Sequence, residues 1–174
     1  MFSMTCDAIA DGGKFPELFL GPGHGANVAP VLRWTGAPAA TQGFALTLAD
    51  DDAPDYVHLV VVLGADAAEF NVFTTDTSMV IGQGTRMFGY EGPCPPGGVH
   101  HYRFTLRALS AMPDLKPGFC SDQLEAAIAG SVIGTATLEA SYNADARRLL
   151  GPQGSRVVGF LRRLRQPAMM QAAA

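Results

Sequence analysis

Apolar and polar residues along the chain are distributed as in a mostly β domain. Residues 44–49 and 57–63 are apolar runs, and the second is nearly continuous, as is typical of a strand buried on both faces. Residues 102–109 alternate between apolar and polar side chains, so their even-numbered positions should share one face of a strand. Residues 138–142 alternate in the same way, and another strand is predicted to end near Trp34. Gly, Pro and Asp residues lie between these segments and predict turns there.

Helices are predicted only toward the C-terminus. The clearest covers residues 122–129, where a serine and an aspartate can cap the start and Leu124 and Ile128 share one face. Gly130 is expected to end this helix. Residues 131–136 are then predicted to continue as a second short helix.

After a short break at 151–154, the pattern becomes that of a basic amphipathic helix that stops at Pro167. Its apolar stripe comprises Val157, Phe160, Leu161 and Leu164, with arginines opposite. We therefore divide the chain into one domain, residues 1–150, and a basic amphipathic C-terminal helix and tail, residues 151–174. We expect the stripe to pack on the domain or on a second subunit, and peripheral contact with an anionic membrane is the alternative.

Composition and charge exclude several classes of protein. A chain of 174 residues with 48% hydrophobic and 16% charged residues suits one globular domain rather than a disordered segment. The start of the chain lacks the basic and apolar regions of a secretory signal, so we expect a cytoplasmic protein. Six arginines lie from Arg147 onward without any acid, which leaves the preceding part acidic within a net charge of −4. An acidic body does not favour binding to nucleic acid.

The cysteines do not form a recognisable metal or disulfide pattern. Cys6, Cys94 and Cys120 are widely spaced and odd in number, without a C-x-x-C pair. We expect free thiols and no zinc site.

Two short segments of the first half could carry chemistry. Asp50, Asp51 and Asp52 follow an apolar strand, and if the strand continues, the first and third carboxylates share a face. The segment can be interpreted as a solvated turn or as a source of ligand groups. It lacks the later ligands and the glycine of a calcium loop, so no metal is predicted. His58 interrupts an apolar strand, and is either a hydrogen-bonded core residue or a site residue.

A third segment, residues 89–102, is a Gly/Pro loop that leads into a strand beginning with two histidines and a tyrosine. Glycines allow a close approach of the backbone, and prolines fix φ. His100 and Tyr102 lie two residues apart on the strand and should point to the same face. The segment is interpreted either as an ordinary loop or as the rim of a small polar pocket with exposed amides.

In this order, the three segments resemble motifs of the phosphatidylethanolamine-binding protein family, in particular its bacterial and archaeal Raf-kinase-inhibitor-like branch. The matching elements are Asp50-x-Asp52-Ala53-Pro54, Tyr56-x-His58, the Gly-Pro-Cys-Pro-Pro…His-x-Tyr segment from Gly92 to Tyr102, and the flanking Asn27-x-x-Pro30, Leu32-x-Trp34 and Pro117-Gly118. The resemblance runs from about residue 11 to residue 142. The ordered combination of motifs is specific, although no single one is.

The resemblance implies a compact β fold in which a large antiparallel sheet packs against a smaller one, with short helices near the C-terminus. It also implies a pocket for phosphate-like anions and phospholipid head groups. Matched motif by motif, the pocket positions are Asp50, Asp52, His58, Gly92, Pro93, His100 and Tyr102. Homodimers occur in the family, so a homodimer is a further expectation.

The chain departs from the family pattern around this pocket. Tyr56 occupies a position that is usually Trp, His101 one that is usually Arg, and Asp51 one that is commonly Pro. The segment 86–89 is Arg-Met-Phe-Gly instead of the Asn-Asp-Phe-Gly typical of this branch. These changes alter the rim, so the ligand cannot be carried over from the family.

We predict a protein that binds a phosphate-like anion or a phosphoethanolamine-type head group without turning it over. Imidazoles, the Tyr102 hydroxyl and loop amides would donate to phosphate oxygens, while Asp50 or Asp52 would receive the ammonium. The first alternative is a regulatory inhibitor that docks on a kinase or protease. The second is an enzyme that uses His58 and His100 in acid–base catalysis, or Cys94 as a nucleophile. No complete catalytic set accompanies these residues, and no cofactor is predicted.

Overall fold

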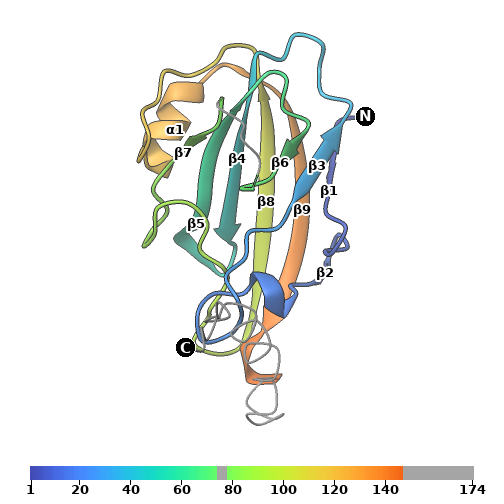
Figure 1. Ribbon diagram of the computed structural model, residues 1–174, viewed down its shortest axis with the longest axis vertical. Helices are drawn as coiled ribbons and strands as arrows, with labels where there is room; N and C mark the ends of the chain where they lie inside the picture. The colour runs from blue at the N-terminus through green and yellow to red at the C-terminus, as the bar shows by residue number, and fades with distance from the viewer. Residues whose placement is uncertain (74–77, 147–174) are drawn as a thin grey trace, which may run out of the picture.

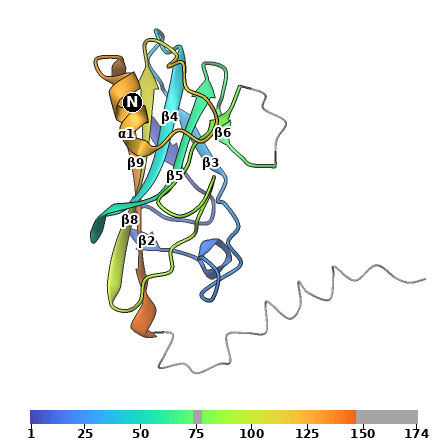
Figure 2. The ribbon, with the colours of Figure 1, turned by 90° about the vertical axis from the view of Figure 1, so that its left-hand side faces the viewer.

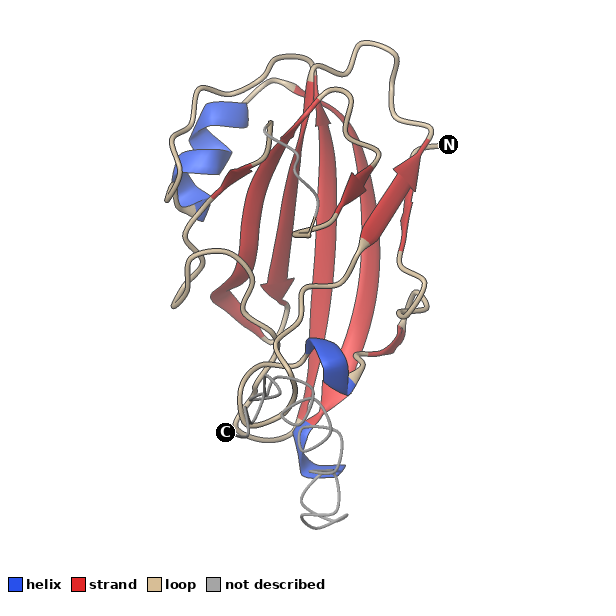
Figure 3. Ribbon diagram, in the orientation of Figure 1, coloured by secondary structure: helices blue, strands red, loops and turns tan. Residues whose placement is uncertain are grey.

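The structure is a computed structural model and describes residues 1–73 and 78–146, which form two β-sheets with little helix (Figures 1 and 3). In the six-stranded sheet the order is β2 (Gly13–Lys14), β9 (Val132–Asn143), β8 (Val99–Leu109), β4 (Gly43–Asp50), β5 (Ala53–Gly64) and β7 (Val80–Ile81). The three-stranded sheet has the order β1 (Ser3–Thr5), β3 (Leu32–Thr35) and β6 (Glu69–Phe70). All neighbours pair antiparallel except β2 and β9. The helical elements with labels are the 3-10 turn η1 (Glu17–Phe19) and α1 (Ser121–Ile128), and residues 144–146, which follow β9, are helical as well.

The large sheet is covered on both faces. On one face, Leu46 of β4 and Phe104 of β8 belong to a core shared with Trp34 of the small sheet. On the other face, Val60 of β5 packs in a second core with Leu124 of α1. Figure 2 shows β3 and β6 on one side of the large sheet and α1 on the other. This burial on both faces explains why the sequence of β5 reads as one continuous apolar run.

Most predicted elements are confirmed, and the observed strands are longer than predicted. The runs 44–49, 57–63 and 102–109 lie within β4, β5 and β8. The predicted helix 122–129 corresponds to α1, but the residue that caps it is Cys120, whose backbone N–H donates to Gln123 Oε1 at 2.9 Å.

The prediction of a second short helix at 131–136 is wrong, because these residues belong to the long strand β9. Gly130 adopts a positive φ of 79° and turns the chain out of α1. From Gly134 onward the backbone pairs with β8 in a regular antiparallel register. Buried Ala136 and Leu138 alternate with exposed neighbours, and this alternation stabilises a strand against the core.

The predicted C-terminal helix and the proposed boundary at residues 150 and 151 lie outside the described residues. Cys6, Cys94 and Cys120 lie within them and are free thiols, as predicted. In the described part of the chain, no helix combines the length and the apolar character needed to cross a membrane.

Candidate ligand-binding site

The candidate site lies at the end of the large sheet where β4 stops and β8 begins, in the lower part of Figure 1. The antiparallel register pairs Asp50, the last residue of β4, with Tyr102 of β8. Along β4, Asp50 alternates in phase with the core residues Leu46 and Leu48. Along β8, His100 and Tyr102 alternate in phase with the core residue Phe104. All three polar side chains therefore project on the face that carries the small sheet.

A β-bulge brings His58 to the same face. Leu48 pairs with Leu59 and Ala49 pairs with Val57, so His58 is an extra residue in β5. Strict alternation from Leu59 would turn His58 toward the α1 side of the sheet. Instead its ring packs edge-on against Tyr102, with ring centroids 5.4 Å apart, while Val57 packs into the core under α1. The irregularity in the ladder is what directs the imidazole into the site.

The loop that precedes β8 forms the wall opposite these strands. A side chain on Gly92 would be 2.1 Å from the Phe19 carbonyl oxygen and 2.5 Å from the Gly21 nitrogen, so only glycine fits there. The backbone N–H of Gly92 donates to Asn27 Oδ1 at 2.7 Å, and Asn27 adopts a positive φ of 54°. The loop is thus fixed against the segment that follows η1.

Together these elements enclose a cavity of about 340 Å³, within the range of small-molecule sites. Its lining comprises Asp50, Ala53, Tyr56, His58, Arg86, Glu91, Gly92, Cys94, Pro95, Pro96, His100 and Tyr102. Five of the seven predicted pocket residues are in this lining: Asp50, His58, Gly92, His100 and Tyr102. Asp52 and Pro93 are not.

Asp52 does not line the cavity because β4 ends at Asp50 and the chain turns there. The Asp52 carboxylate instead accepts hydrogen bonds from the His101 backbone N–H at 2.7 Å and pairs with its ring Nδ1 at 2.9 Å. Both hydrogen bonds from His101 lower the pKa of Asp52, and the bond from the backbone N–H has the larger effect. The expectation that Asp50 and Asp52 share a face required the strand to continue, and it does not.

The loop amides are also used differently from the prediction. The N–H of Gly92 donates to Asn27, and that of Glu91 donates to the His58 carbonyl oxygen at 2.9 Å. The carbonyl of Pro93 accepts from the Gly21 N–H at 2.8 Å and so faces the other loop. The close approach that glycine permits is therefore between two backbones, and the amides of Glu91 and Gly92 are already used within the protein.

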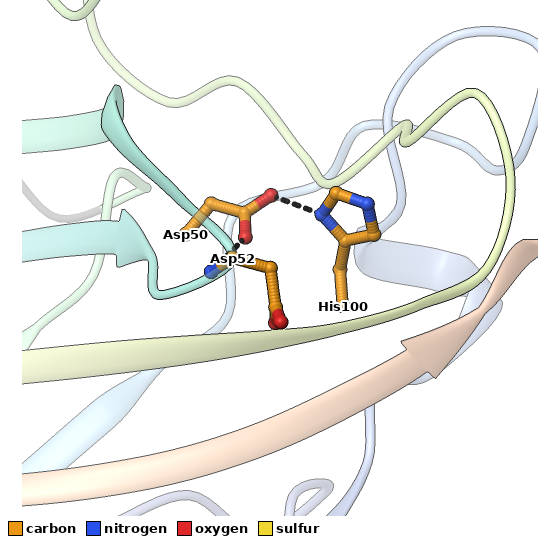
Figure 4. Close-up of side chains that lie close together, drawn as sticks. All are labelled: Asp50, Asp52 and His100. Carbon is orange, nitrogen blue, oxygen red and sulfur yellow. Dashed lines mark hydrogen bonds and ion pairs between the residues drawn. The ribbon is translucent and has the colours of Figure 1, made fainter.

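Asp50 holds His100 in place (Figure 4). The Asp50 side chain is only 7% exposed, and its Oδ2 lies 2.7 Å from His100 Nδ1. Its other oxygen, Oδ1, accepts from the Asp52 backbone N–H at 2.9 Å. Since the carboxylate accepts, His100 Nδ1 carries a proton, and the remaining nitrogen, Nε2, is available to a ligand.

The tautomer of His58 follows from the same reasoning. Its Nδ1 lies 2.8 Å from the Glu91 carbonyl oxygen, which can only accept, so Nδ1 donates. Burial lowers the pKa of His58, and the neutral ring then presents an unprotonated Nε2. That atom is buried and has no hydrogen-bond partner among the described residues.

Tyr102 contributes a second unpartnered group. Tyr102 is 1% exposed, and its hydroxyl lies near the Asp50 carboxylate but has no partner at hydrogen-bond distance within the described part of the chain. Burial, and next the charge of Asp50, raise the pKa of Tyr102, so the phenol keeps its proton and can donate to a ligand.

Seven lining residues are not among the predicted pocket positions, and Glu91 is the most informative of them. Its side chain is 7% exposed, and one carboxylate oxygen lies 3.5 Å from Arg86 Nε. The other oxygen, Oε2, is buried and has no partner at hydrogen-bond distance among the described residues. Burial raises the pKa of Tyr56 most, and a hydrogen bond to the Glu91 carboxylate raises it next. The Tyr56 and Glu91 side chains therefore lie next to each other. A clue was available: Glu91 is the single acid in a Gly/Pro-rich loop.

Asp50, Asp52 and His100 each offer one possible metal-ligand atom within 4.8 Å of the other two. Both carboxylates already have histidine partners: Asp50 Oδ2 pairs with His100 Nδ1, and Asp52 Oδ2 pairs with His101 Nδ1. A cation would have to replace these bonds, so the cluster by itself does not indicate a metal centre.

The lowered pKa of His58 predicts a pH-dependent stability. Below about pH 6.5 the unfolded chain protonates His58 while the folded protein does not, so the free energy of unfolding falls as the pH drops. This contribution is present above the unfolded pKa and is lost as pH falls through the folded pKa. In urea unfolding at about pH 7.5 and pH 5, wild type should lose more stability than His58→Asn, whose amide can still donate to the Glu91 carbonyl. Equal losses would contradict this account.

Comparison with known proteins agrees with these features. The family model described as phosphatidylethanolamine-binding protein matches residues 5–143. The UPF0098 protein of Methanothermobacter thermautotrophicus is 33% identical over 149 residues, which cover 80% of this chain and 97% of that protein.

Two solved structures share the fold. A phosphatidylethanolamine-binding protein homologue from Chlamydia trachomatis superposes with a TM-score of 0.75 at 26% identity and covers 83% of this chain and 98% of its own. Escherichia coli YbcL superposes with a TM-score of 0.75 at 27% identity and covers 82% and 98%. By sequence and by fold, the chain belongs to the phosphatidylethanolamine-binding protein family.

Proposed function

We propose that the cavity binds a small phosphate-bearing ligand of the phosphoethanolamine type and does not turn it over. The observation that carries this proposal is the pair of buried, unpartnered groups in one cavity, His58 Nε2 and the Tyr102 hydroxyl. Leaving a buried polar group unpaired costs about 1–3 kcal/mol, so a ligand that pairs with both would stabilise the protein. The family's name points to the same class of ligand.

Side chains supply the donors for the phosphate. The Tyr102 hydroxyl can donate, and the Arg86 guanidinium lines the cavity with its side chain 70% exposed at the mouth. His100, which Asp50 orients through its Nδ1, offers its Nε2 as a further contact for the ligand.

The hydrogen bonds of His58 and Cys94 favour binding over catalysis by these two residues. His58 Nδ1 is bonded to a backbone carbonyl rather than to a carboxylate, so it lacks the charged partner of a catalytic histidine. The Cys94 thiol lies 3.4 Å from the Pro22 carbonyl oxygen and has no basic partner among the contacts of the described chain. Non-covalent retention of the ligand requires neither group to react.

Isothermal titration calorimetry with inorganic phosphate, phosphoethanolamine and acetate tests the proposal. We expect 1:1 binding of phosphoethanolamine, and no binding of acetate at the same concentrations. Absence of heat and of any thermal shift with both phosphate compounds would refute the function.

A matched pair of tyrosines separates binding from stability. Tyr102→Phe removes a hydroxyl without a partner, so the affinity for phosphoethanolamine should fall about 5- to 20-fold while the melting temperature stays unchanged or rises. Tyr90→Phe removes a hydroxyl that donates to the Phe19 carbonyl at 2.6 Å, so it should lower stability by about 1 kcal/mol and spare binding. Calorimetry and thermal unfolding measure both effects. The opposite pattern would mean that Tyr102 serves the fold and not the ligand.

A further inference from the structure

Cys94 is a nucleophilic side chain of the cavity that the proposed function leaves unused. It is a free, exposed thiol and belongs to the cavity lining. Its position is well defined, because Pro93 and Pro95 fix φ on either side of it. The loop also packs closely on its neighbour, since a methyl group on Gly21 would lie 3.2 Å from the Cys94 Cβ. The thiol is therefore held at one place on the wall of the cavity.

The sulfur of Cys94 lies near the buried hydroxyl of Tyr102. Burial and then Asp50 raise the pKa of Tyr102 most, and the Cys94 sulfur adds to that rise. Sγ also lies 3.4 Å from the Pro22 carbonyl oxygen, on the segment that follows η1. A group attached to Sγ would therefore begin at the cavity wall, within electrostatic reach of the Tyr102 hydroxyl.

Two polar groups of the same cavity point to a small molecule bound beside Cys94. His58 is 4% exposed and Tyr102 is 1% exposed. Neither His58 Nε2 nor the Tyr102 hydroxyl has a partner at hydrogen-bond distance in the described part of the chain. Both residues line the cavity together with Cys94, and its volume of about 340 Å³ suits one small molecule. An adduct on the sulfur and a bound ligand would therefore compete for the same space.

The other two cysteines provide internal controls. Cys120 is exposed and caps α1, whereas Cys6 is partly buried and packs against the main core. Neither residue belongs to the cavity lining. All three thiols experience the same solution conditions, so only a property of the cavity can single out Cys94.

We propose that Cys94 is a modification site, at which a mixed disulfide with a low-molecular-weight thiol closes the cavity to its ligand. The Cys94 thiolate attacks one sulfur of a small disulfide, RS–SR, and a new S–S bond forms as the old one breaks. The departing RS⁻ takes up the proton that Cys94 released, and excess reduced thiol reverses the step. This regulation rests on the proposed function, because it acts on the ligand bound there.

The exchange at Cys94 should be slow. The thiol has no basic partner among the contacts of the described chain, so nothing there favours the thiolate. We expect modification over about minutes to hours, as for uncatalysed disulfide exchange. The site would thus follow the prevailing ratio of small disulfide to thiol.

A cysteine that is merely exposed makes different predictions. Its modification would proceed equally fast with and without a ligand in the cavity. Its adduct would also leave the affinity for that ligand unchanged.

The test treats the full chain with hydroxyethyl disulfide, a small uncharged probe, and follows each cysteine by mass spectrometry of peptides. Phosphoethanolamine at about ten times its Kd should slow the modification of Cys94 about 10-fold, because only the unliganded fraction reacts. The modification of Cys120 should proceed at an unchanged rate. Calorimetry on the modified protein should show an affinity for phosphoethanolamine reduced by at least about 10-fold, and dithiothreitol should restore it.

Two serine variants assign the effect to one thiol. Cys94→Ser should have the same affinity for phosphoethanolamine before and after treatment with the disulfide. Cys120→Ser should lose affinity on treatment, as wild type does. Should Cys94→Ser fail to fold, Cys94→Ala allows the same comparison.

The remaining outcomes separate the two proposals. Unchanged affinity after full modification of Cys94, or equal modification rates with and without ligand, would overturn the regulation and leave the proposed function intact. So would a lack of reaction at Cys94 while Cys120 reacts, or a loss of affinity on treatment of Cys94→Ser. Failure of untreated wild type to bind phosphoethanolamine would overturn both proposals.

Discussion

Replacing Asp50 by asparagine is expected to weaken phosphoethanolamine binding by about 10- to 100-fold. The substitution removes the charge that orients His100 through a 2.7 Å hydrogen bond. Hydrogen bonds to charged groups contribute about 1.5–3 kcal/mol, which corresponds to this range of affinity. Titration calorimetry measures the effect. The free energy of unfolding should fall by less than the free energy of ligand binding, because the amide oxygen can still accept from the Asp52 backbone N–H.

Asp52→Asn is the matched control, since the same charge is removed two residues away. Asp52 is bonded to His101 and lies outside the cavity lining, so ligand affinity should change by less than about threefold. Equal losses of affinity in the two variants would show that the carboxylates act together, and that the cavity as described is not the binding site.

Gly92→Ala is expected to damage both the fold and the site. The new methyl group would be 2.1 Å from the Phe19 carbonyl oxygen and 2.5 Å from the Gly21 nitrogen, and neither backbone segment can move without the other. Overpacking of this kind costs about 1–3 kcal/mol, and here the wall of the cavity has to move to relieve it. We expect that loss in urea unfolding, together with a reduction of phosphoethanolamine affinity by at least about 10-fold.

Gly97→Ala tests the same loop without the clash. A methyl group at Gly97 would meet only the end of the exposed Asp145 side chain, at 3.3 Å, and a small shift of that side chain relieves the contact. Stability and affinity should both stay near those of wild type. If Gly97→Ala is as damaging as Gly92→Ala, the sensitivity belongs to the whole loop and not to its contact with Gly21.

The pattern of apolar and polar residues predicted the long strands, because burial of one or both faces of a strand determines which of its side chains are apolar. It failed at residues 131–136, where small residues such as Ala136 suit a helix or a strand and pairing with β8 decides between them. Gly130 correctly marked the end of α1. The direction of the chain after Gly130 depends on pairing with β8, which is distant in sequence. No local sequence pattern contains that information.

The site was predictable as a set of segments but not in its detail. His58, His100 and Tyr102 converge as the motifs indicated. Asp52 could not be assigned correctly, because the point at which β4 stops pairing is set by its neighbours. Glu91 was missed because a loop acid is usually solvated, and only the fold reveals that this one is buried.

The extra residue in β5 has a consequence for engineering. Regularising that ladder by removing one residue near Val57 would return the imidazole to the opposite side, into the apolar core under α1. A design that makes this strand regular would therefore remove His58 from the proposed site even if the fold stays intact. At this position, a regular ladder and the proposed site exclude each other.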